Sequence, residues 1–210
     1  MIKTALIIGA GELEMGSLRI PDGALVIAAD GGLSHLEKAG ISADYVVGDF
    51  DSLGRVPKGD NVLPSAPEKD DTDTMLAVKL ALELGAETIL IYGGTGGRFE
   101  HSIANLQTLG FIANRGCRGF LVGGGSICTV IKNGKMRFSP ENSGYLSVFA
   151  FAGTAFGVDL AGLKYPLANH TLESDFPLGV SNEFLGESAR VFVREGMLLL
   201  VWDAKNVQFL

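Results

Sequence analysis

The amino-acid sequence predicts an α/β fold in which a three-layer, parallel-sheet domain is followed by a small all-β sandwich domain. Up to about residue 125, apolar strand-like runs alternate with helical segments. From residue 126 onward, short β-rich runs are divided by Gly, Asn and Pro. We therefore place the two domains at 1–125 and 126–210.

The first region contains five apolar runs, which are predicted to be strands: TALIIGA, ALVIAAD, DYVVGDF, TILIYGG and RGFLVGG. Runs that are apolar on both faces and separated by helices are typical of a parallel sheet covered on both sides. The clearest helix is predicted at 74–84, where Leu76, Leu80 and Leu84 recur every four residues and Gly85 can end the helix.

The second region contains the runs YLSVFAF, GVDLAGL, ARVFVR and MLLLVWD, without a helical period. We interpret the last two, which flank Glu195 and Gly196, as a hairpin. Short strands of this kind, divided by turn residues, indicate a sandwich.

Charge and cysteine content restrict the class of partner and the compartment. The net charge is −7, from 17 basic and 24 acidic residues, without a basic run, so neither nucleic acid nor a membrane surface is expected as a partner. No run approaches the roughly 20 apolar residues of a membrane span. The two cysteines form no metal or disulfide pattern, which favours a cytoplasmic location.

Carboxylates follow the predicted strands where ligands bind in open parallel sheets, beyond the carboxyl ends of the strands. Asp30 ends one run, Asp49 and Asp51 end another, and Asp73 immediately precedes residues 74–84 of the predicted helix. Two carboxylates 4 Å apart repel by about 4 kcal/mol at an effective dielectric near 20. A hard cation such as Mg²⁺ removes this cost. In an extended chain, Asp49 and Asp51 would point the same way.

Simpler interpretations exist for each segment alone. The acids near Asp73 can serve only as a helix cap, with Asp71 or Thr72 at the N-cap, and the DFDS segment can be a polar turn. DFDSL after a strand also resembles aspartyl-phosphate phosphatases, although Leu53 stands where that pattern has Thr or Val. The GAGELE segment lacks the third glycine of a dinucleotide motif.

Six segments in order, from residue 28 to 184, resemble the thiamine pyrophosphokinase family: AADGGLSHL, ADYVVGDFDSL, EKDDTDTMLA, GGTGGRFEHSIAN, GLKYPL and GVSNEF. The resemblance implies an α/β nucleotide-binding domain followed by a β-sandwich that binds thiamine. It also implies transfer of a pyrophosphoryl group from ATP to thiamine with release of AMP, and a homodimer whose sites are shared between subunits.

By this resemblance, Mg²⁺ is held by three residues, Asp49, Asp51 and Asp73. The remaining catalytic residues are Asp70 and Arg98. The other substrate-side residues are Asp30, Lys69, Thr72, Glu100, Tyr165, Ser181 and Asn182. This sequence departs from the family pattern at Glu100, where the family has Asp. A thiamine or nucleotide sensor without catalytic activity, on the same fold, is the non-enzyme alternative.

Overall fold

The computed structural model describes residues 3–66 and 70–205, which form two compact units. The first unit comprises the described residues up to 108 together with 117–124. The second comprises 109–116 together with the described residues from 125 onward. An α/β domain is followed by a β-rich domain, which confirms the predicted fold class.

The first unit is built on a parallel sheet in the strand order β6-β5-β1-β2-β3-β4. Its strands are β1 (Thr4–Ile8), β2 (Leu25–Ala29), β3 (Tyr45–Gly48), β4 (Val62–Pro64), β5 (Thr88–Tyr92) and β6 (Arg118–Gly123). The five predicted strands are confirmed. The edge strand β4 was not predicted, because three residues ending in proline carry too little of a strand pattern.

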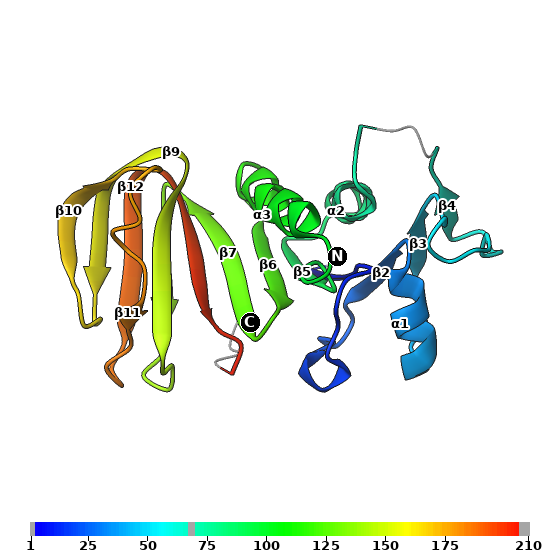
Figure 1. Ribbon diagram of the computed structural model, residues 1–210, viewed down its shortest axis with the longest axis horizontal. Coiled ribbons are helices and arrows are strands. Elements are labelled where there is room, and N and C mark those ends of the chain that lie inside the picture. Colours follow the sequence, from blue (N-terminus) through cyan, green and yellow to red (C-terminus); the bar gives the residue numbers. More distant parts are fainter. Residues whose placement is uncertain (1–2, 67–69, 206–210) are drawn as a thin grey trace. The chain divides into compact units, whose positions relative to one another are not determined.

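The helices are α1 (Gly32–Ala39), α2 (Asp73–Glu83) and α3 (Phe99–Ala113), with a short 3-10 turn, η1 (Met15–Ser17), after β1. Figure 1 shows α1 and α2 on opposite sides of the parallel sheet. Among the residues that the structure describes, no helix is both long and apolar enough to cross a membrane.

The helix α2 confirms the predicted element but not the predicted apolar stripe. Leu76, Leu80 and Leu84 are only half-buried, whereas the most buried side chains are Ala77, Val78 and Ala81. Small side chains let the helix approach β1, β2 and β3 closely, so the contact face is marked by alanine and valine rather than by leucine.

The second unit is antiparallel, with β9 and β12 as its two long central strands. Its strands are β7 (Ser126–Lys132), β8 (Lys135–Phe138), β9 (Tyr145–Ala161), β10 (Leu167–Leu172), β11 (Asn182–Glu183) and β12 (Ala189–Asp203). The strand β12 pairs with β8 through its first residues and with β7 through its last ones, and it pairs with β9 along most of its length.

The hairpin predicted from ARVFVR-EG-MLLLVW is wrong, because these residues form the single strand β12. The register with β9 shifts between Glu195 and Met197, which marks a β-bulge rather than a turn. Gly196 has a φ of +104°, and a Cβ there would lie 2.8 Å from the Thr154 carbonyl oxygen. Glycine therefore bends the strand without ending it.

Candidate functional site

Three carboxylates meet at the carboxyl edge of the parallel sheet. Asp30 follows β2 and Asp49 follows β3, and these strands are neighbours in which Ala29 pairs with Val47. One carboxylate oxygen each from Asp30, Asp49 and Asp51 can be chosen so that all three lie within 4.8 Å of one another. The segments ADG (29–31) and DFD (49–51), which the sequence predicted to converge, therefore lie together in the fold.

The chain does not reach this arrangement in the extended conformation that the sequence suggested for Asp49 and Asp51. Phe50, between them, has a φ of +64°, and the Asp51 N–H donates to Asp49 Oδ1 across 3.2 Å. This local side-chain-to-backbone bond turns the chain immediately after β3. The turn, not strand alternation, brings both carboxylates to the same side.

Asp30 is the buried member of the group, with a side chain that is 8% exposed. Its Oδ2 accepts a hydrogen bond from the Ser52 hydroxyl, and its Oδ1 is buried without a hydrogen-bond partner among the described residues. Burial raises the pKa of the Asp30 carboxyl, and the carboxylates of Asp73, Asp51 and Asp49 raise it further, while the Gly31 N–H opposes the shift. A buried, unpaired carboxylate oxygen beside two others fits a hard, oxygen-ligated cation.

The start of α2 supplies the next acids. Thr72 is the N-cap, and its Oγ1 accepts from the Met75 N–H across 3.2 Å. Asp73 lies in the first turn, close enough to Asp30 to affect its pKa but outside the three-carboxylate group. Asp71 pairs with Lys79 at 2.5 Å, and Asp70 is exposed.

The predicted roles of Asp73 and Lys69 can be compared with their positions in the structure. Asp73 as a metal ligand stays a prediction, because the group that the structure brings together contains Asp30 in its place. Lys69 lies outside the described residues. Ser52 was not singled out from the sequence, although its place in the DFDS segment is a signal that could have identified it.

A glycine loop follows β5 at the same edge of the sheet. It is fastened to the loop after β1, because the Gly9 N–H donates to the Tyr92 carbonyl at 2.8 Å and the Gly11 N–H to the Gly93 carbonyl at 2.7 Å. Gly93 has a φ of +63°, and a Cβ there would lie 2.4 Å from the Gly9 carbonyl oxygen. No larger residue fits where the two loops meet.

Arg98 and Glu100 stand where this glycine loop enters α3. The Arg98 Nε donates to Glu100 Oε1 across 2.6 Å, and both side chains are exposed. This hydrogen bond lowers the pKa of the Glu100 carboxyl. Arg98 is therefore exposed to solvent, and its partner Glu100, which is also exposed, binds it weakly. An anion can displace Glu100 from Arg98.

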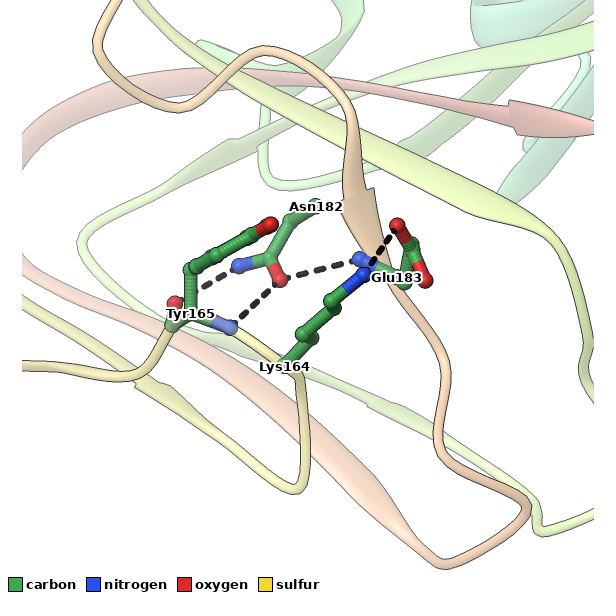
Figure 2. A network of polar contacts seen from close by, with 4 residues as sticks. All are labelled: Lys164, Tyr165, Asn182 and Glu183. Carbon is green, nitrogen blue, oxygen red and sulfur yellow. Dashed lines mark hydrogen bonds and ion pairs between the residues drawn. The ribbon is translucent and has the colours of Figure 1, made fainter.

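In the second unit, Asn182 fixes the backbone of Tyr165 (Figure 2). The buried Asn182 side chain accepts from the Tyr165 N–H at 2.9 Å and donates to the Tyr165 carbonyl at 2.7 Å. Its Oδ1 also accepts from the Glu183 N–H at 2.9 Å, and Glu183 pairs with Lys164 at 2.8 Å. Asn182 therefore holds the backbone of Tyr165, a residue that is 57% exposed.

Ser181, next to Asn182, is exposed and has a φ of +55°. Its N–H donates to the Ser147 hydroxyl oxygen at 3.0 Å, so its own hydroxyl is presented by a turn that is tied to β9. Ser181 and Tyr165 are thus the accessible members of the predicted set in this unit, and both are held by backbone hydrogen bonds.

Comparisons with known proteins match both units. The family described as "Thiamin pyrophosphokinase, catalytic domain" matches residues 20–121, and "Thiamin pyrophosphokinase, vitamin B1 binding domain" matches residues 135–198. A thiamine pyrophosphokinase of Bacillus subtilis is 30% identical over 185 residues, which cover 84% of this chain and 86% of that protein.

Solved structures support the same family. The crystal structure of the Bacillus subtilis thiamine pyrophosphokinase has a TM-score of 0.84 at 28% identity, covering 96% of this chain and 99% of that chain. The thiamin pyrophosphokinase of Candida albicans, at 16% identity and a TM-score of 0.79, shows the fold alone. Fold and comparisons together define the class as a two-domain diphosphotransferase. The chain belongs to the thiamine pyrophosphokinase family, which uses ATP as co-substrate.

Proposed function

We propose that this chain transfers a diphosphoryl group from ATP to the hydroxyl of thiamine, giving thiamine diphosphate and AMP. The observation that carries the proposal is the group of Asp30, Asp49 and Asp51 at the carboxyl edge of the sheet, where α/β folds bind their ligands. Family membership favours this reaction over a phosphatase or a sensor without catalytic activity.

Magnesium is the proposed metal, held by Asp49 and Asp51 with the unpaired Oδ1 of Asp30 beside them. When bound, Mg²⁺ would neutralise charge on the phosphates and on the departing AMP. Asp73, in the first turn of α2, is proposed as a further ligand, and its influence on the pKa of Asp30 supports this. Without a cation, these acids would repel a polyphosphate, which is the physical reason to propose one.

The protein's part in the reaction is positioning and electrostatics. The thiamine oxygen forms a bond to the β-phosphorus while the bond from that phosphorus to the AMP oxygen breaks. The hydroxyl proton passes to a carboxylate, Asp73 or Asp70, or to water. Arg98 exchanges Glu100 for a phosphate oxygen and stabilises the charge that develops there.

Thiamine is proposed to bind against Tyr165 and Ser181. In this proposal each site of a homodimer combines the first unit of one chain with the second unit of its partner. Support comes from large apolar side chains that the second unit leaves more than two-fifths exposed: Tyr145, Tyr165, Phe176, Leu178, Val180 and Leu185. Large exposed apolar patches mark association surfaces, and five of these six residues fall within residues 165–185. The two free cysteines favour a cytoplasmic location.

The test is to incubate the protein with ATP, Mg²⁺ and thiamine and to identify the nucleotide product. AMP formed one-for-one with thiamine diphosphate is expected. ADP would indicate an ordinary kinase, free phosphate alone would indicate the phosphatase, and thiamine binding without turnover would indicate the sensor.

A further inference from the structure

The outward face of the sheet formed by β8, β12 and β9 carries mostly positive charge. Side chains alternate along these strands, so that Val191 and Val193 are buried while their neighbours point outward. The outward cations on β8 and β12 are Lys135, Arg137, Arg190 and Arg194, all of them exposed. On a chain whose net charge is −7, this concentration of cations on two short strand segments requires a physical account.

Arg137 and Arg190 stand directly opposite each other in the antiparallel ladder, and Lys135 lies opposite Phe192. Residues paired in this way have Cα atoms about 5 Å apart. Like charges directly opposite each other destabilise a sheet. The sequence therefore holds two arginines where folding alone would favour an arginine and an acid.

In the part of the chain that the structure describes, no ion pair offsets the repulsion between Arg137 and Arg190. Within the ranges 3–66 and 70–205, no hydrogen bond or ion pair joins Arg137, Arg190 or Lys135 to another side chain. A carboxylate on the same face, Asp159 of β9, lies opposite Phe192 rather than opposite Arg190, and its Oδ1 accepts from the Asn169 N–H at 2.7 Å.

We propose that Arg137 and Arg190, flanked by Lys135, bind a soluble, multiply charged phosphate. Two guanidinium groups on facing positions can each offer paired N–H donors to one phosphate group, which is the ligand geometry that arginine suits best. Such a ligand removes the repulsion between the two arginines. The half-buried Phe192 lies beside the pair on β12 and provides an apolar floor.

Two larger classes of anion fit less well. A membrane surface would meet a protein of net charge −7, and a nucleic acid would require cations spread along a longer track. The cations here are confined to Lys135–Arg137 and Arg190–Arg194. The proposal goes beyond the proposed reaction and uses none of its residues, so either can fail without the other.

The experiment measures binding of inorganic diphosphate and of ATP, separately, to the full chain by calorimetry at constant ionic strength without divalent metal. Six proteins are compared: wild type, Arg137→Gln, Arg190→Gln, the pair Arg137→Gln with Arg190→Gln, Arg98→Gln, and the control pair Lys38→Gln with Lys58→Gln. The control removes the same charge from exposed positions of the first unit.

A binding event that survives in Arg98→Gln and in the control pair, and that weakens at least tenfold in the double arginine variant, is expected. Which of the two probes shows it identifies a bare oligophosphate or a nucleotide as the source of the phosphate. Without any probe, the double arginine variant should melt at the wild-type temperature or above it. Unchanged binding of both probes in a double variant that folds normally would overturn the proposal, as would a clear fall in its melting temperature together with unchanged binding by each single variant.

Discussion

Arg98 and Glu100 form an ion pair at the entrance to α3, in which the Arg98 Nε donates to Glu100 Oε1 across 2.6 Å. The sequence placed both residues at the site but did not show that they bind each other. Glu100 is longer by one methylene than the aspartate of the family pattern. If Arg98 contacts phosphate, as proposed, it must first leave this glutamate, so the ion pair would compete with the substrate.

Replacing Glu100 with Gln should therefore lower the KM for ATP, by up to about fivefold, because an exposed ion pair is a weak competitor. The effect should shrink at high salt, and the melting temperature should not change. Steady-state kinetics at two ionic strengths measure it. Glu87→Gln, the same change at the opposite edge of the sheet, is the control. A large loss of kcat would instead indicate that the Glu100 carboxylate acts on a metal-bound water.

Asp51→Asn should abolish turnover and leave the metal-free protein as stable as wild type or more so. The reason is that the variant removes one of three crowded carboxylates while keeping the side-chain shape. Thermal unfolding with and without Mg²⁺ checks this, since Mg²⁺ should stabilise wild type much more than the variant. Asp60→Asn, an exposed loop position, controls for the loss of charge. A metal-free variant that unfolds well below wild type would make Asp51 a structural residue.

The raised pKa of Asp30 predicts a pH dependence of the metal-free protein. A folded-state pKa above the unfolded value means that the folded protein binds more protons, so the free energy of unfolding falls as pH rises through the folded pKa. Asp30→Asn keeps an acceptor for Ser52 and removes the titration. Urea unfolding in EDTA from pH 3.5 to 8 should therefore show wild type losing stability relative to the variant as pH rises. A difference that is constant with pH would contradict the expectation.

Strand positions in the first unit could be predicted because fully buried parallel strands are continuous apolar runs, as in ALVIAAD and TILIYGG. The single strand β12 could not, since a Glu-Gly pair reads equally as a turn and as a bulge, and only tertiary pairing with β9 decides between them. The same limit applies at the site. The sequence pointed to Asp30, Asp49 and Asp51, but burial and the Ser52 contact, which distinguish Asp30 from the other two, exist only after folding.

Asn182→Ala should reduce the free energy of unfolding by about 1–3 kcal/mol, because it removes the buried amide that accepts from the Tyr165 N–H and donates to the Tyr165 carbonyl. If Asn182 acts through Tyr165, the variant should raise the KM for thiamine more than it lowers kcat. Asn182→Asp keeps the acceptor but turns a buried carboxylate oxygen toward the Tyr165 carbonyl, so at neutral pH it should destabilise the protein at least as much as Asn182→Ala. A wild-type melting temperature for Asn182→Ala, with lost thiamine binding, would show direct contact instead.

The shared site of the proposed homodimer can be tested by mixing two inactive variants. Asp51→Asn damages the first unit, and Tyr165→Ala damages the second at an exposed side chain, which makes it a better choice than the buried Asn182. In a twofold dimer with shared sites, a mixed dimer has one site with both defects and one site that is wild type.

Random reassociation after unfolding and refolding the two variants together gives about half mixed dimers, so roughly a quarter of the wild-type activity should return. Each variant refolded alone should stay inactive, and differently tagged chains allow the mixed dimer to be purified and counted. Activity should then follow the amount of mixed dimer and not the total protein. If each site were built within one chain, every site would keep a defect. Purified mixed dimers without activity would therefore exclude the shared site, while a protein that remains monomeric at assay concentration would exclude the homodimer itself.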